Sequence, residues 1–461
     1  MKKTNNIFST QNGNTIIGNL FERLSNTQII VLGFLVFILL GSAILALPIS
    51  SSTGKFQPYI DALFTATSAV STTGLIVEDT GSYYSLFGQI VILILIQVGG
   101  IGYMSFIVLI FFFMRKKLSL RGHLLIQDSY SGVTSENIYR IINLIIIYTV
   151  VVEVFGTILY FIAWFDDFPR LQALYLGLFH SISTFCTAGF SLFSNSFMNY
   201  SNDIFVNLIT FFLCIAGGIG FLVINDIVSL ITNKKSPFKF SRMNSHSKLV
   251  ITMALILFSL GSLLIIASEA INSSSQIHGF LVNIFQAISA SSTTGYNSAD
   301  IALYSRSSLF IMIVFMFIGT APASTGGGVK STTIGIIYLA IFSTLRRNKA
   351  TNIFHRRVPE YIISSALSIV ILALTIITSA TFIMLLYEDK PLLDLLFETV
   401  SAFGTVGLSM GITSQLHNLS KIVIIMVMFI GRIGPLSIGL FFIKNSVRAN
   451  YTYADGDFIV G

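Results

Sequence analysis

Long apolar runs alternate with short polar segments along the whole chain. The runs at 27–47 and 86–113 are each long enough to cross the hydrocarbon core of a bilayer, which takes about 20 helical residues. Runs of this kind recur in pairs, and a shorter amphiphilic segment separates the two members of each pair. We therefore predict eight membrane-spanning helices, near 28–47, 86–114, 138–164, 204–231, 247–267, 309–345, 361–386 and 422–443.

Each pair of apolar runs encloses one copy of the motif Phe-x-x-x-Ser-x-x-x-Thr-x-Gly. The copies end at Gly74, Gly189, Gly295 and Gly407, and the intervals between these glycines are 115, 106 and 112 residues. A repeat of this length indicates four related structural units. In every unit we expect an outgoing helix, a short helix that dips back into the membrane, the Ser-Thr-Gly loop and a returning helix. The short helices should begin near Pro58, Pro169, His278 and Pro391.

The four repeats are expected at 27–114, 138–231, 247–345 and 361–443. Cytoplasmic linkers at 115–137, 232–246 and 346–360 should join them, between a cytoplasmic N-terminal segment (1–26) and a cytoplasmic tail (444–461). Non-helical backbone is tolerated at membrane depth only where it is buried in protein or faces water, so the four loops should meet on one axis. The predicted fold class is an all-α membrane protein with four parallel helix–pore-loop–helix repeats around a pseudo-fourfold central pore, unlike the inverted repeats of many transporters.

Composition and charge agree with a polytopic membrane protein. Of the 461 residues, 54% are hydrophobic and only 10% are charged, which excludes an ordinary soluble domain. The net charge of +7 comes from Lys and Arg clustered after alternate spans, as the positive-inside rule requires, and this places both termini in the cytoplasm. The basic balance therefore reports topology, and no nucleic-acid partner is expected. Cys186 and Cys214 lack metal-ligand spacing and are interpreted as packing residues.

The repeated loops contain the groups that bind a dehydrated monovalent cation. Backbone carbonyls and Ser or Thr hydroxyls replace the water of such an ion without a fixed charge that would hold it too tightly, and glycine lets the carbonyls turn toward one axis. No filter position is acidic, which argues against a divalent ion. The alternative, close packing of small residues at helix contacts, would suffice for one copy but not for four. The candidate filter residues are Ser71, Thr72, Thr73, Gly74, Cys186, Thr187, Ala188, Gly189, Ser292, Thr293, Thr294, Gly295, Gly404, Thr405, Val406 and Gly407.

The four units with one filter glycine each resemble the Trk/Ktr potassium-uptake superfamily, which includes fungal and plant relatives. The resemblance begins near residue 27 and covers essentially the rest of the chain. It implies a channel-like subunit with potassium as the transported ion, because glycine in all four loops is the potassium-preferring pattern. None of the copies matches the longer TVGYG filter of tetrameric channels, so fewer stacked ion sites and less strict selectivity are expected.

The first unit begins soon after the N-terminus, and in this respect the sequence is most similar to the bacterial Ktr membrane subunit. That resemblance implies a homodimer in the bacterial plasma membrane, surrounded by lipid and seated on a separate cytoplasmic ring of the RCK type. Nucleotide would then be bound only by the partner ring, to which the basic linkers are candidate contacts. No metal or organic cofactor is expected, and sodium remains a possible second ion.

The third returning helix should break at an unusual run of small residues. Proline removes a helix hydrogen bond and consecutive glycines weaken the helix further. The resemblance to Trk and Ktr subunits implies an intramembrane gate here, and a passive kink is the alternative. Gly328-Val-Lys-Ser resembles a phosphate-binding loop, but its lysine is displaced and no strand precedes it. The candidate gate residues are Gly319, Thr320, Ala321, Pro322, Ala323, Ser324, Thr325, Gly326, Gly327, Gly328 and Lys330.

Arg432 is the one arginine well inside a predicted returning helix. A charge at that depth is costly and by default functional, although a snorkelling or packing role is the alternative. Because Arg432 aligns with Thr320 of the gate segment, we hypothesise that it repels cations and hydrogen-bonds the closed loop. His180 and Gln286 are interpreted as making local hydrogen bonds, whereas Glu153 and Glu398 are either structural partners or ligands of a second ion site.

Two other function classes require sequence features that are not apparent in this chain. A secondary transporter that works by alternating access, such as a potassium/sodium symporter, would need inverted repeats or a charged midplane site. An enzyme would need a His, Cys or carboxylate cluster on facing spans, and none is apparent, so no catalytic residue is predicted. No arginine ladder suggests voltage sensing.

Overall fold

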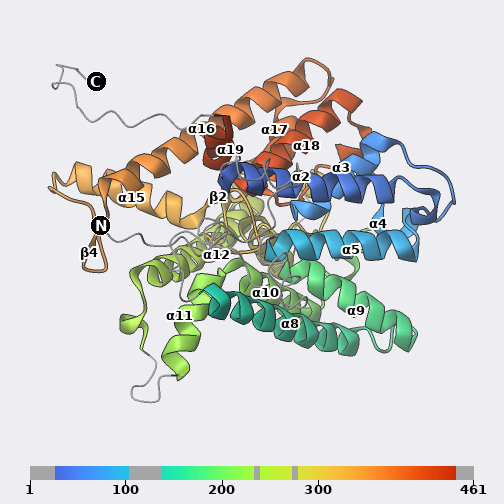
Figure 1. Cartoon of the computed structure of the whole chain (residues 1–461), viewed down its shortest axis with the longest axis horizontal. Coiled ribbons are helices and arrows are strands. Elements are labelled where there is room, and N and C mark those ends of the chain that lie inside the picture. The colour runs from blue at the N-terminus through green and yellow to red at the C-terminus, as the bar shows by residue number, and fades with distance from the viewer. Residues whose placement is uncertain (1–25, 103–137, 233–238, 273–278, 443–461) are drawn as a thin grey trace, which may run out of the picture.

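The computed structural model describes residues 26–102, 138–232, 239–272 and 279–442, and helices make up nearly all of their regular structure (Figure 1). Within these ranges, four helices are long and apolar enough to cross a membrane, and a bent pair adds a fifth candidate. The four are the predicted outgoing helices, α2 (Asn26–Leu45), α8 (Ile138–Ala163), α12 (Ser245–Ile271) and α16 (Glu360–Leu385).

A short helix follows each outgoing helix. These helices have 12–16 residues and are too short to span a bilayer. Three of them begin directly after a proline, whose fixed φ suits a helix start, and the other begins after Gly279. We call them the pore helices: α3 (Tyr59–Val70), α9 (Arg170–Phe185), α13 (Phe280–Ser291) and α17 (Leu392–Gly404).

The returning helices begin where a side chain accepts a hydrogen bond from the first helical turn. Ser85, Asp203, Ser305 and His417 serve as these caps. The helices are α5 (Leu86–Ile101), α10 (Ile204–Gly218), α14 (Arg306–Phe317) and α18 (Asn418–Ile433), and beyond them lie α11 (Phe221–Thr232), α15 (Ser331–Leu345) and α19 (Pro435–Phe442). The remaining short elements before or between them are α4 (Thr80–Tyr83) and the 3-10 turns η1 (Pro48–Ser50), η3 (Met198–Tyr200), η4 (Phe240–Arg242), η5 (Ile301–Leu303) and η6 (Thr413–Gln415).

The prediction of continuous returning helices at 204–231 and 422–443 was wrong. Helices α10 and α11 meet at an angle of 94°, and the chain turns at Gly220, whose φ is +90°. Gly434, with φ +96°, separates α18 from α19 in the same way. The glycines permit these left-handed turns, and the turn at Gly220 frees the amide of Phe221 to donate to the carbonyl of Ala323 at 2.8 Å. The apolar pattern does not register such breaks because the residues on both sides remain apolar.

The third returning helix breaks where the sequence predicts. Strands β1 (Ile318–Gly319) and β2 (Val329–Lys330) pair in parallel and close the non-helical segment between α14 and α15. A second small sheet was not predicted: β3 (Asn352–Ile353) and β4 (Arg356–Arg357) form an antiparallel hairpin within the expected linker 346–360. The expected N-terminal segment up to residue 25, the stretch 103–137, and the tail from 443 lie outside the described residues.

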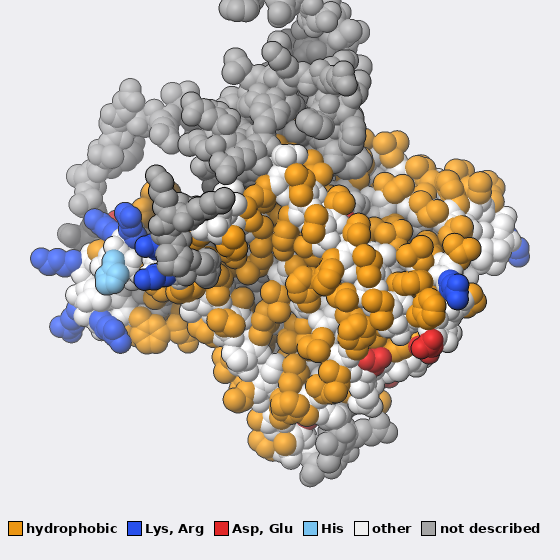
Figure 2. All heavy atoms as spheres, turned by 90° about the horizontal axis from the view of Figure 1, so that it is seen from below, with side chains coloured by type: hydrophobic (Ala, Val, Ile, Leu, Met, Phe, Trp, Pro, Cys, Tyr) orange, Lys and Arg blue, Asp and Glu red, His pale blue; other side chains and the backbone are white. Residues whose placement is uncertain are grey.

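The core is made of side chains that the four units share. The phenylalanines that open the repeated motif, Phe64, Phe179, Phe285 and Phe397, are all fully buried. One apolar cluster joins the first two units and a second joins the last two, and Phe64 and Leu75 of the first unit extend into the second cluster. Apolar side chains also cover a broad outer face, and Lys and Arg gather at one end of the molecule (Figure 2). The exposed apolar belt is what a lipid-facing surface requires.

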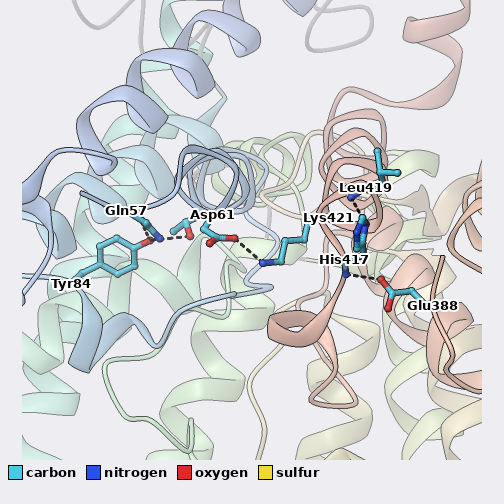
Figure 3. A network of polar contacts seen from close by, with 8 residues as sticks. Gln57, Asp61, Tyr84, Glu388, His417, Leu419 and Lys421 are labelled. Atoms are coloured by element: carbon cyan, nitrogen blue, oxygen red, sulfur yellow. Dashed lines mark hydrogen bonds and ion pairs between the residues drawn. The ribbon is translucent and has the colours of Figure 1, made fainter. Parts of the chain in front are cut away.

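An ion pair joins the first unit to the last. Helices α3 and α18 lie side by side, although their residues are separated by most of the chain (Figure 1). Lys421 Nζ on α18 donates to Asp61 Oδ1 on α3 at 2.8 Å, and both side chains are largely buried (Figure 3). Glu78 lies nearby in the loop outside the helices; burial and the charge of Asp61 raise its pKa, while Lys421 opposes this shift. No connecting segment joins units one and four, so this pair is one of the contacts that hold them together.

Removing one partner of this pair should destabilise the protein. Asp61→Asn or Lys421→Met leaves an uncompensated buried charge, which costs about 3–5 kcal/mol. We expect a lower midpoint of thermal unfolding in detergent for each single variant, and a smaller loss for the double variant Asp61→Leu/Lys421→Met. Glu360→Gln, which breaks the exposed pair with Arg357, is the matched control and should change the midpoint little. Single variants as stable as the parent would contradict the assignment.

Candidate functional site

The four loops that follow the pore helices have the same backbone conformation. Thr72, Thr187, Thr293 and Thr405 all have φ between 50° and 54°, a left-handed conformation that is uncommon for threonine. The filter glycines two residues later also have positive φ, between 66° and 93°. In every unit, the amide between them donates to the carbonyl of the motif serine, at 2.8–3.0 Å. The matching sequences therefore fold into matching loops.

The motif serine fixes each loop a second time through its hydroxyl. In units one and four, Ser68 Oγ and Ser401 Oγ accept hydrogen bonds from the amides of the filter glycines, at 3.0 and 3.1 Å. In units two and three, the serine hydroxyl instead donates to the carbonyl of the residue after the filter glycine, from Ser183 to Phe190 and from Ser289 to Tyr296, at 2.8 Å in both cases. These bonds explain why serine recurs six residues before each glycine.

The filter glycines meet in a closed cycle. Each lies against the carbonyl that precedes the glycine of the next unit: Gly74 against Ala188, Gly189 against Thr294, Gly295 against Val406, and Gly407 against Thr73. A Cβ at any of these four glycines would overlap the neighbouring carbonyl oxygen. The structure thus brings together all four predicted filter loops, and glycine is required here both for φ and for close approach.

A polar cavity opens on one side of this ring. It has a volume of about 410 Å³ and is lined by the four filter glycines together with side chains from the segments that follow them, among them Ser191, Asp300, Ser409 and Thr413. We call it the outer cavity. Its polar lining and direct access to the ring suit the entry of a hydrated cation.

The segment 319–330 lies against the other side of the ring and contacts all four loops. Thr72 Oγ1 donates to the carbonyl of Thr325 at 3.2 Å, and Thr187 Oγ1 lies 3.2 Å from Thr325 Oγ1. Gly326 packs against Thr293 and Gly327 against Thr405. The hydroxyls of Thr293 and Thr405 are buried and have no hydrogen-bond partner among the described residues. Three residues of the segment, Thr325, Gly326 and Gly327, therefore contact one threonine in each of the four loops.

Small residues of the returning helices hold this segment in place. The amides of Ala321 and Thr325 donate to the carbonyls of Gly218 and Gly217, both at 3.3 Å, and the amide of Gly328 donates to Gly431 at 3.3 Å. A Cβ at Gly217 would overlap the carbonyl of Phe185, so the glycines permit close approach. This geometry gives a structural reason for the adjacent glycines at 217 and 218.

Arg432 joins the gate segment to the first unit. Its guanidinium donates to the carbonyl of Thr325 and, through the other nitrogen, to the carbonyl of Gly99. Lys330 Nζ donates to the carbonyl of Gly326 at 2.6 Å, within the same segment. Both side chains line an inner cavity of about 400 Å³, together with Pro322, Ala323, Ser324, Gly326 and Gly328. A cation that reaches this cavity would meet the positively charged guanidinium of Arg432.

A buried acid lies behind the second loop. Gln97 Nε2 on α5 donates to both carboxylate oxygens of Glu153 on α8, at 2.9 and 3.1 Å, and Cys186 Sγ approaches the same group at 4.0 Å. Glu153 lines neither cavity. Sequence reasoning named Glu153 but missed Gln97. The position of Gln97, as a polar residue within an apolar run, could have indicated a buried partner. It also missed Lys421 as the partner of Asp61.

Within the described residues, no group of His, Cys, Asp and Glu side chains forms a metal site.

Comparison with known proteins identifies similar chains of matching length. The family model described as "TrkH: Cation transport protein" matches residues 19–452. The Ktr system potassium uptake protein B of Bacillus subtilis is 37% identical over 444 residues, which cover 95% of this chain and 97% of that protein. The potassium/sodium uptake protein NtpJ of Enterococcus hirae is 32% identical and covers 95% of this chain and 98% of its own length.

A solved structure has the same fold. The potassium transporter TrkH from Vibrio parahaemolyticus superposes with a TM-score of 0.70 and covers 92% of this chain and 86% of that chain. The sequence identity in this comparison is 18%, so the likeness concerns the fold alone.

Proposed function

Because the chain belongs to the TrkH family of cation transport proteins, we propose that it takes up potassium across the cell membrane as a channel-like subunit. The closed cycle of four filter glycines and neighbouring carbonyls is the observation that carries this proposal. Curated relatives that this chain matches over nearly their whole length are named as potassium uptake proteins. The chain is a multi-pass membrane protein of the transporter class, for which no catalytic residues are proposed.

Ion selection is assigned to the sixteen filter residues named from the sequence. Carbonyls and threonine hydroxyls around the ring would replace the hydration shell of a monovalent cation, and no filter residue is acidic. The pore helices end at the ring, so the partial negative charges of their C-termini add to the attraction. The buried, unpaired hydroxyls of Thr293 and Thr405 support a ligand role for this layer.

The topology proposed for this function has eight spans in four parallel repeats and both termini in the cytoplasm. The exposed basic residues of the β3–β4 hairpin, which follow α15, support a cytoplasmic location for that end of the molecule under the positive-inside rule. The outer cavity then opens outward, and uptake runs from it through the ring to the inner cavity. A bacterial plasma membrane is the proposed location.

The segment 319–330, with Arg432, is proposed to be the gate. Its contacts with all four filter threonines occupy the ion path, and its non-helical backbone can change without unfolding a continuous helix. Regulation is assigned to a separate cytoplasmic ring of nucleotide-binding RCK-type subunits, as the Ktr-system names of the relatives support. We further propose that the chain forms a homodimer and binds nucleotide only through that partner.

A potassium/sodium symporter working by alternating access is the second candidate. The Enterococcus hirae relative is named a potassium/sodium uptake protein, and this name supports the symporter as an alternative. A carrier must close one side of the ion site before the other opens, whereas a gated pore conducts many ions in each opening. Transport rates in liposomes therefore discriminate between the two mechanisms.

Liposomes that contain the purified chain should show monovalent-cation flux. We expect potassium and rubidium gradients to drive faster flux than sodium gradients, since the ring offers carbonyl and hydroxyl oxygens without a fixed charge. Flux is measured with and without a cytoplasmic nucleotide-binding partner. Absence of flux for every monovalent cation under both conditions would overturn the proposed function, and empty liposomes are the control.

Serine at a filter glycine should weaken discrimination against sodium. In Gly74→Ser, the side chain enters a position with φ +88° and overlaps the carbonyl of Ala188, so the ring must deform. Gly295→Ser should act in the same way against Val406. Flux ratios for potassium and sodium provide the measurement. Gly279→Ala, where the nearest atom would lie 4.0 Å away, is the control. Unchanged ratios in the serine variants would argue against the carbonyl ring.

Removing the guanidinium of Arg432 should raise flux. Arg432→Ala loses the hydrogen bonds to the carbonyls of Thr325 and Gly99 and removes a positive charge from the inner cavity. Arg432→Lys keeps the charge but cannot reproduce the two-pronged contact, so it should give an intermediate flux. Flux is compared at equal amounts of monodisperse protein. Unchanged or lower flux in a well-folded Arg432→Ala variant would rule out a closing role.

A further inference from the structure

The residue nine positions before each filter glycine has a role that the motif itself does not reveal. These residues are Thr65, His180, Gln286 and Glu398, and each directly follows the buried phenylalanine of its pore helix. All four are buried, and none of them lines the outer or inner cavity. Their chemistry differs between units, whereas their place in the repeat is the same.

In three units, this side chain binds the backbone just beyond the filter. The amide three residues after the glycine donates to it: Leu192 to His180 Nε2 at 3.3 Å, Ser298 to Gln286 Oε1 at 3.4 Å, and Met410 to Glu398 Oε1 at 3.0 Å. In the first unit, Thr65 Oγ1 instead accepts from Tyr84 at 3.0 Å. In units two to four, the position therefore fastens the outer end of the filter loop to the pore helix.

Glu398 makes the largest number of such bonds. Its Oε1 also accepts from Ser409 Oγ at 2.5 Å, and its Oε2 accepts from Thr413 Oγ1 at 2.9 Å. Ser409 and Thr413 line the outer cavity, so the carboxylate holds part of the cavity wall from behind. A buried carboxylate with three donors is a strong, charge-assisted anchor.

In unit two, His180 also forms hydrogen bonds to the segment that lines the outer cavity. Its Nδ1 faces the carbonyl of Leu176 at 2.9 Å, which can only accept, so Nδ1 carries the proton and Nε2 accepts. Nε2 then receives the amide of Leu192 and lies 3.1 Å from Ser191 Oγ, another residue of the outer cavity. By contrast, Gln286 makes one long bond, and its Nε2 has no partner among the described residues.

The units differ in a second interaction that stabilises the filter loop, a hydrogen bond between two side chains of the filter itself. In units one and three, two side chains of the filter itself bond to each other: Ser71 with Thr73 at 2.7 Å, and Ser292 with Thr294 at 2.8 Å. The equivalent pairs in units two and four are Cys186 with Ala188 and Gly404 with Val406, which cannot form this bond. The units without the hydroxyl pair are those with the stronger anchor.

We propose that Glu398 and His180 are positioning residues for ion selection. They hold the filter loops of units two and four, which lack the internal hydroxyl brace, while Gln286 and Thr65 contribute little. This inference rests on the proposed potassium conduction. Glu398 therefore acts as a structural partner of the filter and does not serve as a second ion ligand.

Potassium and sodium flux in liposomes tests this role in the full chain. Glu398→Ala leaves three donors unsatisfied, and we expect the potassium-to-sodium flux ratio to fall roughly tenfold, about the effect of one lost buried hydrogen bond. Glu398→Gln keeps an acceptor for the amide of Met410, as glutamine does in unit three, and should retain part of the ratio. Gln286→Ala should lower the ratio much less than Glu398→Ala.

Glu269→Ala is the matched control for the loss of a buried acid. Glu269 also accepts from two serine hydroxyls and one amide, at Ser305 and Ser308, but these lie at the start of α14, and Glu269 lines neither cavity. We expect it to reduce thermal stability and leave the flux ratio unchanged. If the parent conducts and Glu398→Ala keeps its ratio, or if Glu269→Ala lowers the ratio equally, the positioning role is wrong. If Glu398→Ala does not fold, a Glu398→Gln variant with the full parental ratio overturns it as well. A parent without flux would instead refute the proposed function.

Discussion

The structure depends on one constraint: backbone amides and carbonyls that are buried in an apolar environment must find hydrogen-bond partners or close contacts. Four loops of left-handed and glycine backbone lie at the centre of an apolar protein, where unpaired amides and carbonyls are costly. The pore-helix serines satisfy one side of each loop, and the neighbouring unit packs against the other. No single unit can meet this requirement, because each glycine needs the carbonyl of the next loop beside it. The buried phenylalanines and the Asp61–Lys421 pair serve to hold the four units at that distance.

The asymmetry between units arises within this shared frame. Unit three supplies the non-helical segment, unit four supplies Arg432, and units one and two supply the glycine carbonyls and amide contacts that receive them. Identical filter backbones thus coexist with different surroundings. The same division holds behind the filter, where a serine–threonine pair in one unit is replaced by a buried histidine or glutamate in another.

Periodicity and repetition predicted much of this architecture. The four outgoing helices, the short helices after Pro58, Pro169 and Pro391, and the break at 319–330 follow from apolar run length, proline and glycine. The bends at Gly220 and Gly434 were missed because an apolar run gives no sign of a change in direction. Contacts between distant units were also beyond sequence reasoning: nothing local relates Lys421 to Asp61, or Gln97 to Glu153. Alignment of the four repeats was enough to name the candidate filter residues. The order in which the four loops pack around the ring could be seen only in the structure.

Thr325 has a consequence for the kinetics of opening. Its backbone and hydroxyl oxygens contact Thr72, Thr187, Arg432 and the carbonyl of Phe185, which belong to three different units. Displacing this one residue breaks all of these contacts together, and none of them can be released while the others hold the segment in place. Partial withdrawal would leave buried polar groups without partners and thus have a high free energy. The proposed gate should therefore alternate between two discrete states, without graded intermediates, and the proposed regulator would need to shift only the balance between them.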